Sequence, residues 1–248
     1  ENGKILPGKF RLIYDASFGG DTSDSVNDFI DRLECSCAGF DRALDLLAEK
    51  GKGAWLLKFD IKSAFRLLAV RLLDRHLLGL SFAGKFAFDC RLPFGLRSSP
   101  ALWERYASTL EWIIMQQLRS DSLTHHVDDF LALFASRELA EQARDVIKRL
   151  CAELGVPLND DKEQLGQAIP YAGYTIDTLN WRISVTKERK EDVIDTINAV
   201  LQSKRVQLSP AQEARWQAAL RRQSDPCGTP LRLPRVPHDP RQRWQTRQ

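Results

Sequence analysis

The chain has 248 residues, of which 43% are hydrophobic and 28% are charged, as in a globular protein with one large or two small domains. No apolar run approaches the roughly 20 residues of a membrane span, and no signal-peptide pattern opens the sequence, so we expect no membrane partner. The five cysteines are odd in number and lack the spacing of a zinc site. We therefore expect reduced thiols in an intracellular protein of the cytoplasm or nucleus.

The net charge of +3 is unevenly distributed along the chain. Residues 215–248 contain eight arginines, two aspartates and five of the eleven prolines, a local net charge of +6, which leaves −3 for residues 1–214. We interpret residues 1–203 as the folded part and residues 204–248 as a basic Pro/Arg-rich tail that is disordered or frameshifted. The single methionine, Met115, and the start at Glu1 suggest part of a longer protein.

The apolar spacing of the first half predicts short strands and one helix. A buried strand over residues 54–59 ends at Asp60, and a short helical segment follows from Ser63. The remaining elements are a strand over 9–15, a loop over 17–25, a helix over 40–50, and a hairpin of residues 77–82 and 85–90 around Ala83-Gly84.

The second half predicts a helix from Pro100 to about residue 119, a hairpin centred on Asp128 and Asp129, and a helix over 137–154. A hairpin of 171–177 with 181–185 and a helix over 186–203 follow. The core order strand, helix, hairpin, helix, strand predicts an α+β fold, a ferredoxin-like split βαβ sheet with helices on one face. In that topology Asp60 and Asp128 meet at one end of the sheet.

Two Asp-Asp pairs occur in different surroundings. Asp160 and Asp161 lie in the polar stretch VPLNDDKEQ and are typical of a solvated turn. Asp128 and Asp129 instead interrupt the apolar stretch LTHHVDDFLALF. Two carboxylates at the edge of a core repel each other and lose hydration unless a cation neutralises them. Hard divalent ions, above all Mg²⁺, prefer such oxygen ligands, so the sequence predicts a metal site.

Three carboxylates from separate segments indicate catalysis as well as metal binding. Two divalent ions roughly 3.5–4 Å apart suit phosphoryl transfer. Because side chains alternate along a strand, Asp128 and Asp129 have unequal roles. In such a reaction one ion activates a 3′-hydroxyl, here that of a primer strand, and the other stabilises the leaving pyrophosphate. We expect Asp60 and Asp128 to bridge the ions and Asp129 to lie nearer the primer end or one metal.

Six segments in order resemble the motifs of reverse transcriptases. FDIKSAF (59–65), LPFGLRSSP (92–100) and HHVDDF (125–130) are similar to the palm motifs. KFRLIYDAS (9–17) resembles the preceding fingers strand, and GVPLNDDK (155–162) and YAGYTID (171–177) resemble the motifs that follow. SVND (25–28), RHLLGL (75–80) and LPFGLRSSP are most similar to retrotransposons of the DIRS-like tyrosine-recombinase group. The resemblance covers about residues 4–203 and implies a polymerase palm with partial fingers.

The resemblance implies an RNA-directed DNA polymerase that adds dNTPs to a primer 3′-hydroxyl. Its partners would be an RNA or DNA template with a DNA primer, and its cofactors two Mg²⁺ ions, for which Mn²⁺ can substitute. By resemblance, the metal ligands are Asp60, Asp128, Asp129 and the backbone carbonyl of Ile61. The three aspartates are the expected catalytic residues.

The same resemblance assigns residues to the incoming dNTP. Lys9 and Arg11 would hold the triphosphate, although an ordinary exposed strand face has the same pattern. Phe65 would lie under the sugar and exclude a ribose 2′-hydroxyl, or be a plain core residue. Gly95 and Arg97 would shape the loop beneath the nascent base pair, or simply a turn before a helix.

Further roles follow the catalytic hairpin. Lys162 would protonate the leaving pyrophosphate, or be a solvated lysine. Gly173 and Tyr174 would grip the primer strand, although Tyr174 is equally suited to packing in a hairpin. The family usually has Tyr where this chain has His126, which leaves the metal ligands unchanged. A zinc site at His125 and His126 is geometrically poor.

Two other functions fit parts of the pattern. A relic without catalysis would at most bind nucleic acid, although the three aspartates are intact. A nucleotide cyclase shares a two-carboxylate ferredoxin-like core, but LPFGLRSSP and Arg11 suit a template-directed enzyme better. For the tail from about Arg215, permissible codons read one nucleotide later spell Gly-Lys-Leu, Phe-Ala-Ala and Pro-Ala-Gly-Arg elements like those that follow the palm in DIRS-like enzymes.

Overall fold

A computed structural model describes residues 13–19, 24–31, 33 and 39–202. The predictions for Lys9, Arg11 and residues 204–248 lie outside the described residues. Among the described helices, none combines the length and apolar character that crossing a bilayer requires. Cys90 and Cys151 are both free thiols.

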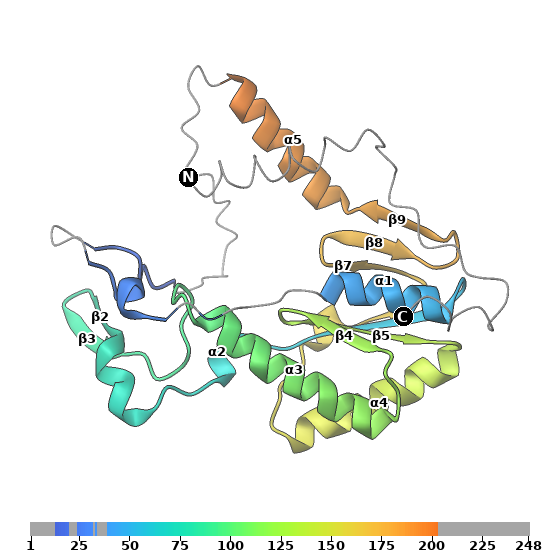
Figure 1. Ribbon diagram of the computed structural model, residues 1–248, viewed down its shortest axis with the longest axis horizontal. Helices are drawn as coiled ribbons and strands as arrows, with labels where there is room; N and C mark the ends of the chain where they lie inside the picture. Colours follow the sequence, from blue (N-terminus) through green and yellow to red (C-terminus); the bar gives the residue numbers. More distant parts are fainter. Residues whose placement is uncertain (1–12, 20–23, 32, 34–38, 203–248) are drawn as a thin grey trace, which may run out of the picture.

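A four-stranded antiparallel sheet forms the centre of the fold (Figure 1). The helices α3 (Ser99–Leu118) and α4 (Arg137–Glu153) pack on one face of it. In chain order the elements of this layer are β1 (Trp55–Asp60), α3, β4 (Leu123–His126), β5 (Asp129–Phe134), α4 and β6 (Gln164–Gly166). The predicted split βαβ fold is confirmed, although β6 takes the place of the predicted last strand over 171–177. The strands lie in the order β4, β5, β1, β6.

Both faces of the central sheet are apolar, and both are covered. Phe59 and Phe130 point toward α3 and α4, where Trp103 and Ile147 complete the core. The alternate positions, such as Leu131, pack instead against helix α1 (Gly39–Lys50) and a second sheet. Helix α1 therefore covers the face opposite to α3 and α4, because apolar residues on both sides of β1 and β5 need partners.

The second sheet corrects one predicted element. Tyr171 to Asp177 was expected to be one strand, but the chain reverses at Ala172 and Gly173, whose φ angles are 50° and 82°. Positive φ at both central residues is the requirement of a two-residue type I′ hairpin turn. The strands are β7 (Ala168–Tyr171), β8 (Tyr174–Asp177) and β9 (Arg182–Val185), followed by α5 (Lys187–Gln202). The sequence pattern missed β7, and it also missed β6, which has only three residues.

The remaining elements lie to one side of the central sheet, near the start of α3 (Figure 1). The predicted hairpin at Ala83-Gly84 is confirmed with shorter strands. Of the predicted strand 9–15, Ile13 forms a single parallel bridge with Phe94. The elements are η2 (Val26–Phe29), α2 (Ala64–Leu67), η3 (Leu72–Leu78), β2 (Gly79–Phe82) and β3 (Lys85–Phe88), and η4 (Asp160–Lys162) follows α4.

Candidate active site

The turn that carries the aspartate pair is tight and strained. His126 pairs with Asp129, so that Val127 and Asp128 alone connect β4 and β5. Val127 has φ 58°, a conformation that a β-branched residue rarely adopts. Its carbonyl accepts a hydrogen bond of 2.7 Å from the indole Nε1 of Trp103, which is fully buried on α3. Helix α3 therefore holds the turn in place.

The sheet register brings the three aspartates to one end of the sheet. Asp60, the last residue of β1, lies directly opposite Asp129, the first residue of β5. The backbone N–H of Ile61 donates to the carbonyl of Asp128 over 3.1 Å. Burial raises the pKa of the Asp128 carboxyl, and the charges of Asp60 and Asp129 raise it further. The structure thus assembles the repelling carboxylate group that the sequence predicts.

Two lysines partly neutralise this group. Lys162 Nζ lies 2.8 Å from Asp60 Oδ2, and this hydrogen bond raises the pKa of Lys162. Asn159 donates to the other Asp60 oxygen over 3.2 Å. Lys58 Nζ lies 3.1 Å from Asp129 Oδ2. Sequence reasoning missed Lys58, although its position two residues before Asp60 places both side chains on the same face of β1.

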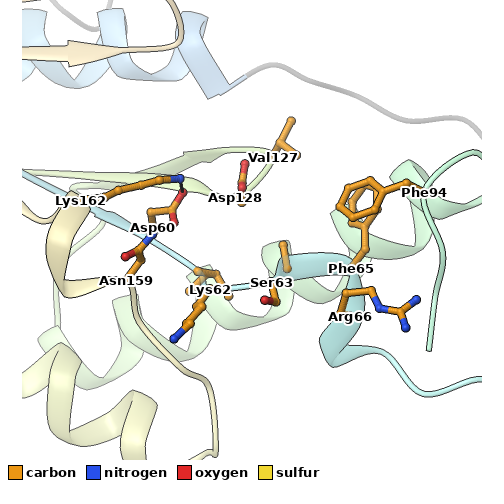
Figure 2. A pocket seen from close by; sticks show the side chains of 12 residues that line it. Asp60, Lys62, Ser63, Phe65, Arg66, Phe94, Val127, Asp128, Asn159 and Lys162 are labelled. Carbon is orange, nitrogen blue, oxygen red and sulfur yellow. Dashed lines mark hydrogen bonds and ion pairs between the residues drawn. The ribbon is translucent and has the colours of Figure 1, made fainter. Parts of the chain in front are cut away.

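A cavity of about 570 Å³ opens beside the aspartates. Figure 2 shows Asp60 and Asp128 at one end, with Lys162 reaching Asp60, and Phe65 against Phe94 at the other end. The ring centroids of Phe65 and Phe94 are 5.0 Å apart, and those of Phe65 and Trp103 are 6.2 Å apart. The other lining residues are Ile61, Lys62, Ser63, Ala64, Arg66, Val127 and Asn159.

The loop before α3 is fixed by a buried asparagine that sequence reasoning did not single out. Asn27 is 4% exposed, donates to the Gly95 carbonyl over 3.0 Å, and accepts from the Arg97 backbone N–H over 2.8 Å. Gly95 has φ 106°, and a Cβ there would lie 1.8 Å from the carbonyl oxygen of Tyr14. Only glycine fits this crossing. The Arg97 guanidinium lies 3.9 Å from Asp28.

Gly173 and Tyr174 lie in the second sheet rather than around the cavity. Tyr174 stacks on Phe40 of α1 with ring centroids 4.6 Å apart, and the Arg189 guanidinium lies 5.0 Å from its ring. A Cβ on Gly173 would meet Arg189 Nη1 at 2.4 Å. These contacts give both residues a packing role at the turn between β7 and β8.

His125 occupies a buried site between two glutamates of α3. Its Nδ1 pairs with Glu111, and its Nε2 lies 3.3 Å from Glu104 Oε1, without the alignment of a hydrogen bond. Burial lowers the His125 pKa, but the two glutamates outweigh burial and raise it. His125 also stacks on Phe130 at 5.2 Å. Its ring is therefore engaged in the protein interior beneath the aspartate turn.

The carboxylate oxygens at the aspartates suit a hard divalent ion, because such ions prefer oxygen ligands. Asp60 is almost fully buried, and Asp128 has no lysine within ion-pair distance among the described residues. Among those same residues, no three His, Cys, Asp or Glu side chains are gathered closely enough to hold one ion. Asp60 and Asp128 face the cavity, while Asp129 is paired with Lys58.

A split βαβ sheet with aspartates at the end of β1 and in the β4–β5 turn agrees with the polymerase-type palm that the resemblance predicts. The family model described as reverse transcriptase (RNA-dependent DNA polymerase) matches residues 5–176. The chain belongs to this family. It is similar to the retrovirus-related Pol polyprotein from transposon gypsy of Drosophila melanogaster, with 25% identity over 135 residues, which are 53% of this chain and 12% of that protein.

Solved structures share the fold. A foamy viral protease-reverse transcriptase in complex with double-stranded DNA matches with a TM-score of 0.58 and 18% identity, over 76% of this chain and 30% of that chain. A foamy viral protease-reverse transcriptase in complex with an RNA/DNA hybrid matches with a TM-score of 0.51 and 19% identity, over 69% and 22%. The chain spans less than a third of the length of each of these proteins.

Proposed function

We propose that this chain catalyses template-directed nucleotidyl transfer as an RNA-directed DNA polymerase. One observation carries the proposal: Asp60 and Asp128, from two separate segments, line one cavity together with an aromatic wall at Phe65. The family that the chain belongs to supports the same reaction. The substrates would be dNTPs and a DNA primer on an RNA or DNA template, and the protein would act inside the cell.

The metal ligands would be the carboxylates of Asp60 and Asp128 and the carbonyl of Ile61, with Asp129 beside them. When bound, two Mg²⁺ or Mn²⁺ ions would lower the pKa of the primer 3′-hydroxyl and stabilise charge on the triphosphate. The raised pKa of Asp128 supports this assignment, because a carboxylate that is costly to ionise alone gains most from a cation.

The side chains around the cavity have separate roles in the proposal. Phe65 closes the space that a 2′-hydroxyl would occupy, since its ring is fixed by Phe94 and Trp103. Lys162 lines the cavity beside Asp60, and there it would face the leaving pyrophosphate and supply a proton. Asn27 keeps the loop of Gly95 and Arg97 in one conformation beneath the nascent base pair.

The remaining assignments rest on the resemblance alone. Lys9 and Arg11 would hold the triphosphate, and Gly173 and Tyr174 would grip the primer. We place the fingers and palm in residues 1–203 and assign the parent element to the DIRS-like tyrosine-recombinase group of retrotransposons.

We also propose that residues 204–248 form a basic tail and that, from about Arg215 to Gln248, this tail is read out of frame. Sequencing the gene tests this: a +1 frame from about codon 215 should encode the Gly-Lys-Leu and Pro-Ala-Gly-Arg elements. Stops in that frame would contradict it. Restoring the frame should increase affinity for a primer–template duplex.

Primer extension on an RNA template with dNTPs and Mg²⁺ tests the function, with Asp128→Asn as the inactive control and a nucleotide cyclisation assay in parallel. Extension by the wild type alone supports the polymerase. Cyclisation without extension would support a nucleotide cyclase, the alternative that the two-carboxylate core suggests. Duplex binding with neither activity, in a chain with the frame restored, would support the relic.

A further inference from the structure

The second aspartate of the pair has a lysine partner of its own. Lys58 lies in the middle of β1, opposite Leu131 of β5 and Gln164 of β6, so its backbone is fixed on both sides. Its side chain is only 13% exposed and its Nζ lies 3.1 Å from Asp129 Oδ2. Lys58, Asp60 and Asp129 share one face of the sheet, because Lys58 and Asp60 are two residues apart and Asp129 pairs with Asp60.

The two lysines of the site differ in how easily each can break its ion pair with an aspartate. The Lys162 side chain is 53% exposed, ends the short turn η4 and lines the cavity, so its ammonium can move into solvent or toward a ligand. Lys58 comes from the central strand and is not among the cavity-lining residues that the structure describes. Lys162 is therefore a replaceable partner of Asp60, whereas Lys58 is a fixed partner of Asp129.

The adjacent aspartates differ in whether they line the cavity. Asp128 lines the cavity together with Asp60, and Asp129 is not among the described residues that line it. Lys58 offsets part of the charge of Asp129, and the remaining charge still adds to that of Asp60 in repelling the Asp128 carboxylate.

We infer that Lys58 is a positioning residue that holds Asp129 away from the cavity, so that Asp60 and Asp128 are the two carboxylates that ligate metal. This inference rests on the proposed polymerase function and narrows the ligand set that the resemblance implies. It assigns Asp129 an indirect role, in which its charge is satisfied by protein and not by the ions.

Calorimetric titration of the whole chain with Mn²⁺ separates the aspartates. Asp60→Asn and Asp128→Asn should each weaken binding at least about tenfold, because each removes a charged ligand. Asp129→Asn should stay within about threefold of the wild type, because it removes only a neighbouring charge that Lys58 already pairs. Equal losses for Asp129→Asn and Asp60→Asn would overturn the inference. A wild type that binds no better than Asp60→Asn would instead count against the proposed metal site itself.

Lys58→Met tests the positioning role directly, since it keeps the side-chain length and removes the charge. It should free Asp129, tighten Mn²⁺ binding by about threefold or more, and lower kcat for nucleotide addition about tenfold with little change in the KM for dNTP. Adding Asp129→Asn to Lys58→Met should return the Mn²⁺ affinity to that of Asp129→Asn alone, and Lys58→Arg should behave as the wild type.

Lys148→Met is the matched control, because Lys148 pairs with Asp160 and Glu163 away from the cavity. It should leave Mn²⁺ affinity and kcat unchanged. If Lys58→Met matches Lys148→Met in both quantities and changes only the melting temperature, Lys58 is a structural residue and the inference fails. If Lys58→Met does not fold, the Asp129→Asn titration decides alone.

Discussion

The chain contains the same dipeptide, Asp-Asp, in two turns with opposite properties. Asp128 lies in the turn between two buried strands and Asp129 begins the second of them, and burial raises the pKa of Asp128. Asp160 opens the 3-10 turn η4, its side chain is 77% exposed, and it pairs with Lys148 at the surface. The dipeptide itself therefore carries no function. The apolar neighbours of the first pair force it against the core, and the polar neighbours of the second leave it in water.

The two turns also meet in space. Asn159 and Lys162, which flank the solvated pair, both hydrogen-bond to the Asp60 carboxylate. The exposed turn thus supplies a cation and a donor to the buried group. The site combines both, with the carboxylates on the central sheet and a replaceable partner, the half-exposed side chain of Lys162, on a surface turn.

The sharpest contrast between the turns is expected from Asp128→Asn. It should lower the rate of primer extension at least about a hundredfold, because it removes a charged metal ligand. It should also raise the melting temperature of the metal-free protein at neutral pH. The pKa of Asp128 is raised on folding, so its ionisation costs stability as pH rises through the folded pKa, and asparagine removes that cost.

The stability difference between wild type and Asp128→Asn should vanish below the unfolded carboxyl pKa of about 3.9, where the wild type is protonated in both states. Thermal melts between pH 3 and pH 8 measure it. Near-normal extension by the variant, beside an active wild type, would contradict the assignment.

Phe65→Val tests whether the cavity beside the buried turn selects the sugar. We expect incorporation of ribonucleotides relative to deoxynucleotides to rise about tenfold or more, because the smaller side chain leaves space for the 2′-hydroxyl. Single-nucleotide incorporation with each substrate gives the ratio. An equal loss for both, with a destabilisation of about 3 kcal/mol, would identify Phe65 as a plain core residue.

Trp103→Phe tests whether the hydrogen bond from α3 keeps the buried turn in its strained conformation. Phenylalanine keeps the aromatic bulk but leaves the Val127 carbonyl without its 2.7 Å donor. We expect a loss of about 1–3 kcal/mol in stability and about tenfold in extension rate. Val127→Gly in the same chain should recover part of the rate, since glycine adopts φ 58° without strain. A rate unchanged in Trp103→Phe would show that the bond does not position Asp128.

A smaller effect is expected from His125, which lies beneath the buried turn and has no counterpart at the exposed one. Because Glu111 and Glu104 raise its pKa on folding, the stabilisation is complete below the unfolded pKa of about 6.5 and is lost as pH rises through the folded value. The wild type should exceed His125→Gln by about 1 kcal/mol at pH 6, and by less at pH 9. Urea denaturation at both pH values measures the difference, and a pH-independent gap would refute the charge-based explanation.

The smallest effect belongs to the exposed pair. Asp160→Asn should change stability by less than about 0.5 kcal/mol, because Lys148 keeps its second partner, Glu163, at 2.8 Å. Extension should equal that of the wild type. A loss of activity comparable to that of Asp128→Asn would break the comparison between the two turns.

Much of the fold followed from the sequence because the palm helices and strands have strong apolar periodicity. The helices α3 and α4 and the strand β1 begin and end within one or two residues of the predicted positions. The turn between β4 and β5 is formed by Val127 and Asp128, one residue earlier than the predicted centre on Asp128 and Asp129. Strand β6 was missed because it is too short to show alternation. The single strand predicted over residues 171–177 was wrong because Ala172 takes a positive φ beside Gly173, although alanine is not a residue that indicates such a turn.

At the site, sequence spacing brought Asp60 and Asp128 together but could not show their partners. Lys58 and Trp103 both read as ordinary strand and helix residues. Their roles depend on which atom lies within hydrogen-bond distance, namely Asp129 Oδ2 and the Val127 carbonyl. Such contacts arise from the register between strands and from a helix packed across a turn, and neither is encoded in local periodicity.

The proposed function requires Asp60 and Asp128 to form a divalent-metal site for nucleotidyl transfer. Anomalous scattering from Mn²⁺ in crystals grown with a dNTP locates such ions. We expect two peaks roughly 3.5–4 Å apart, with carboxylate oxygens of Asp60 and Asp128 within coordination distance. Nucleotide density without any Mn²⁺ peak at these two carboxylates, or peaks only at Asp160 and Asp161, would contradict it.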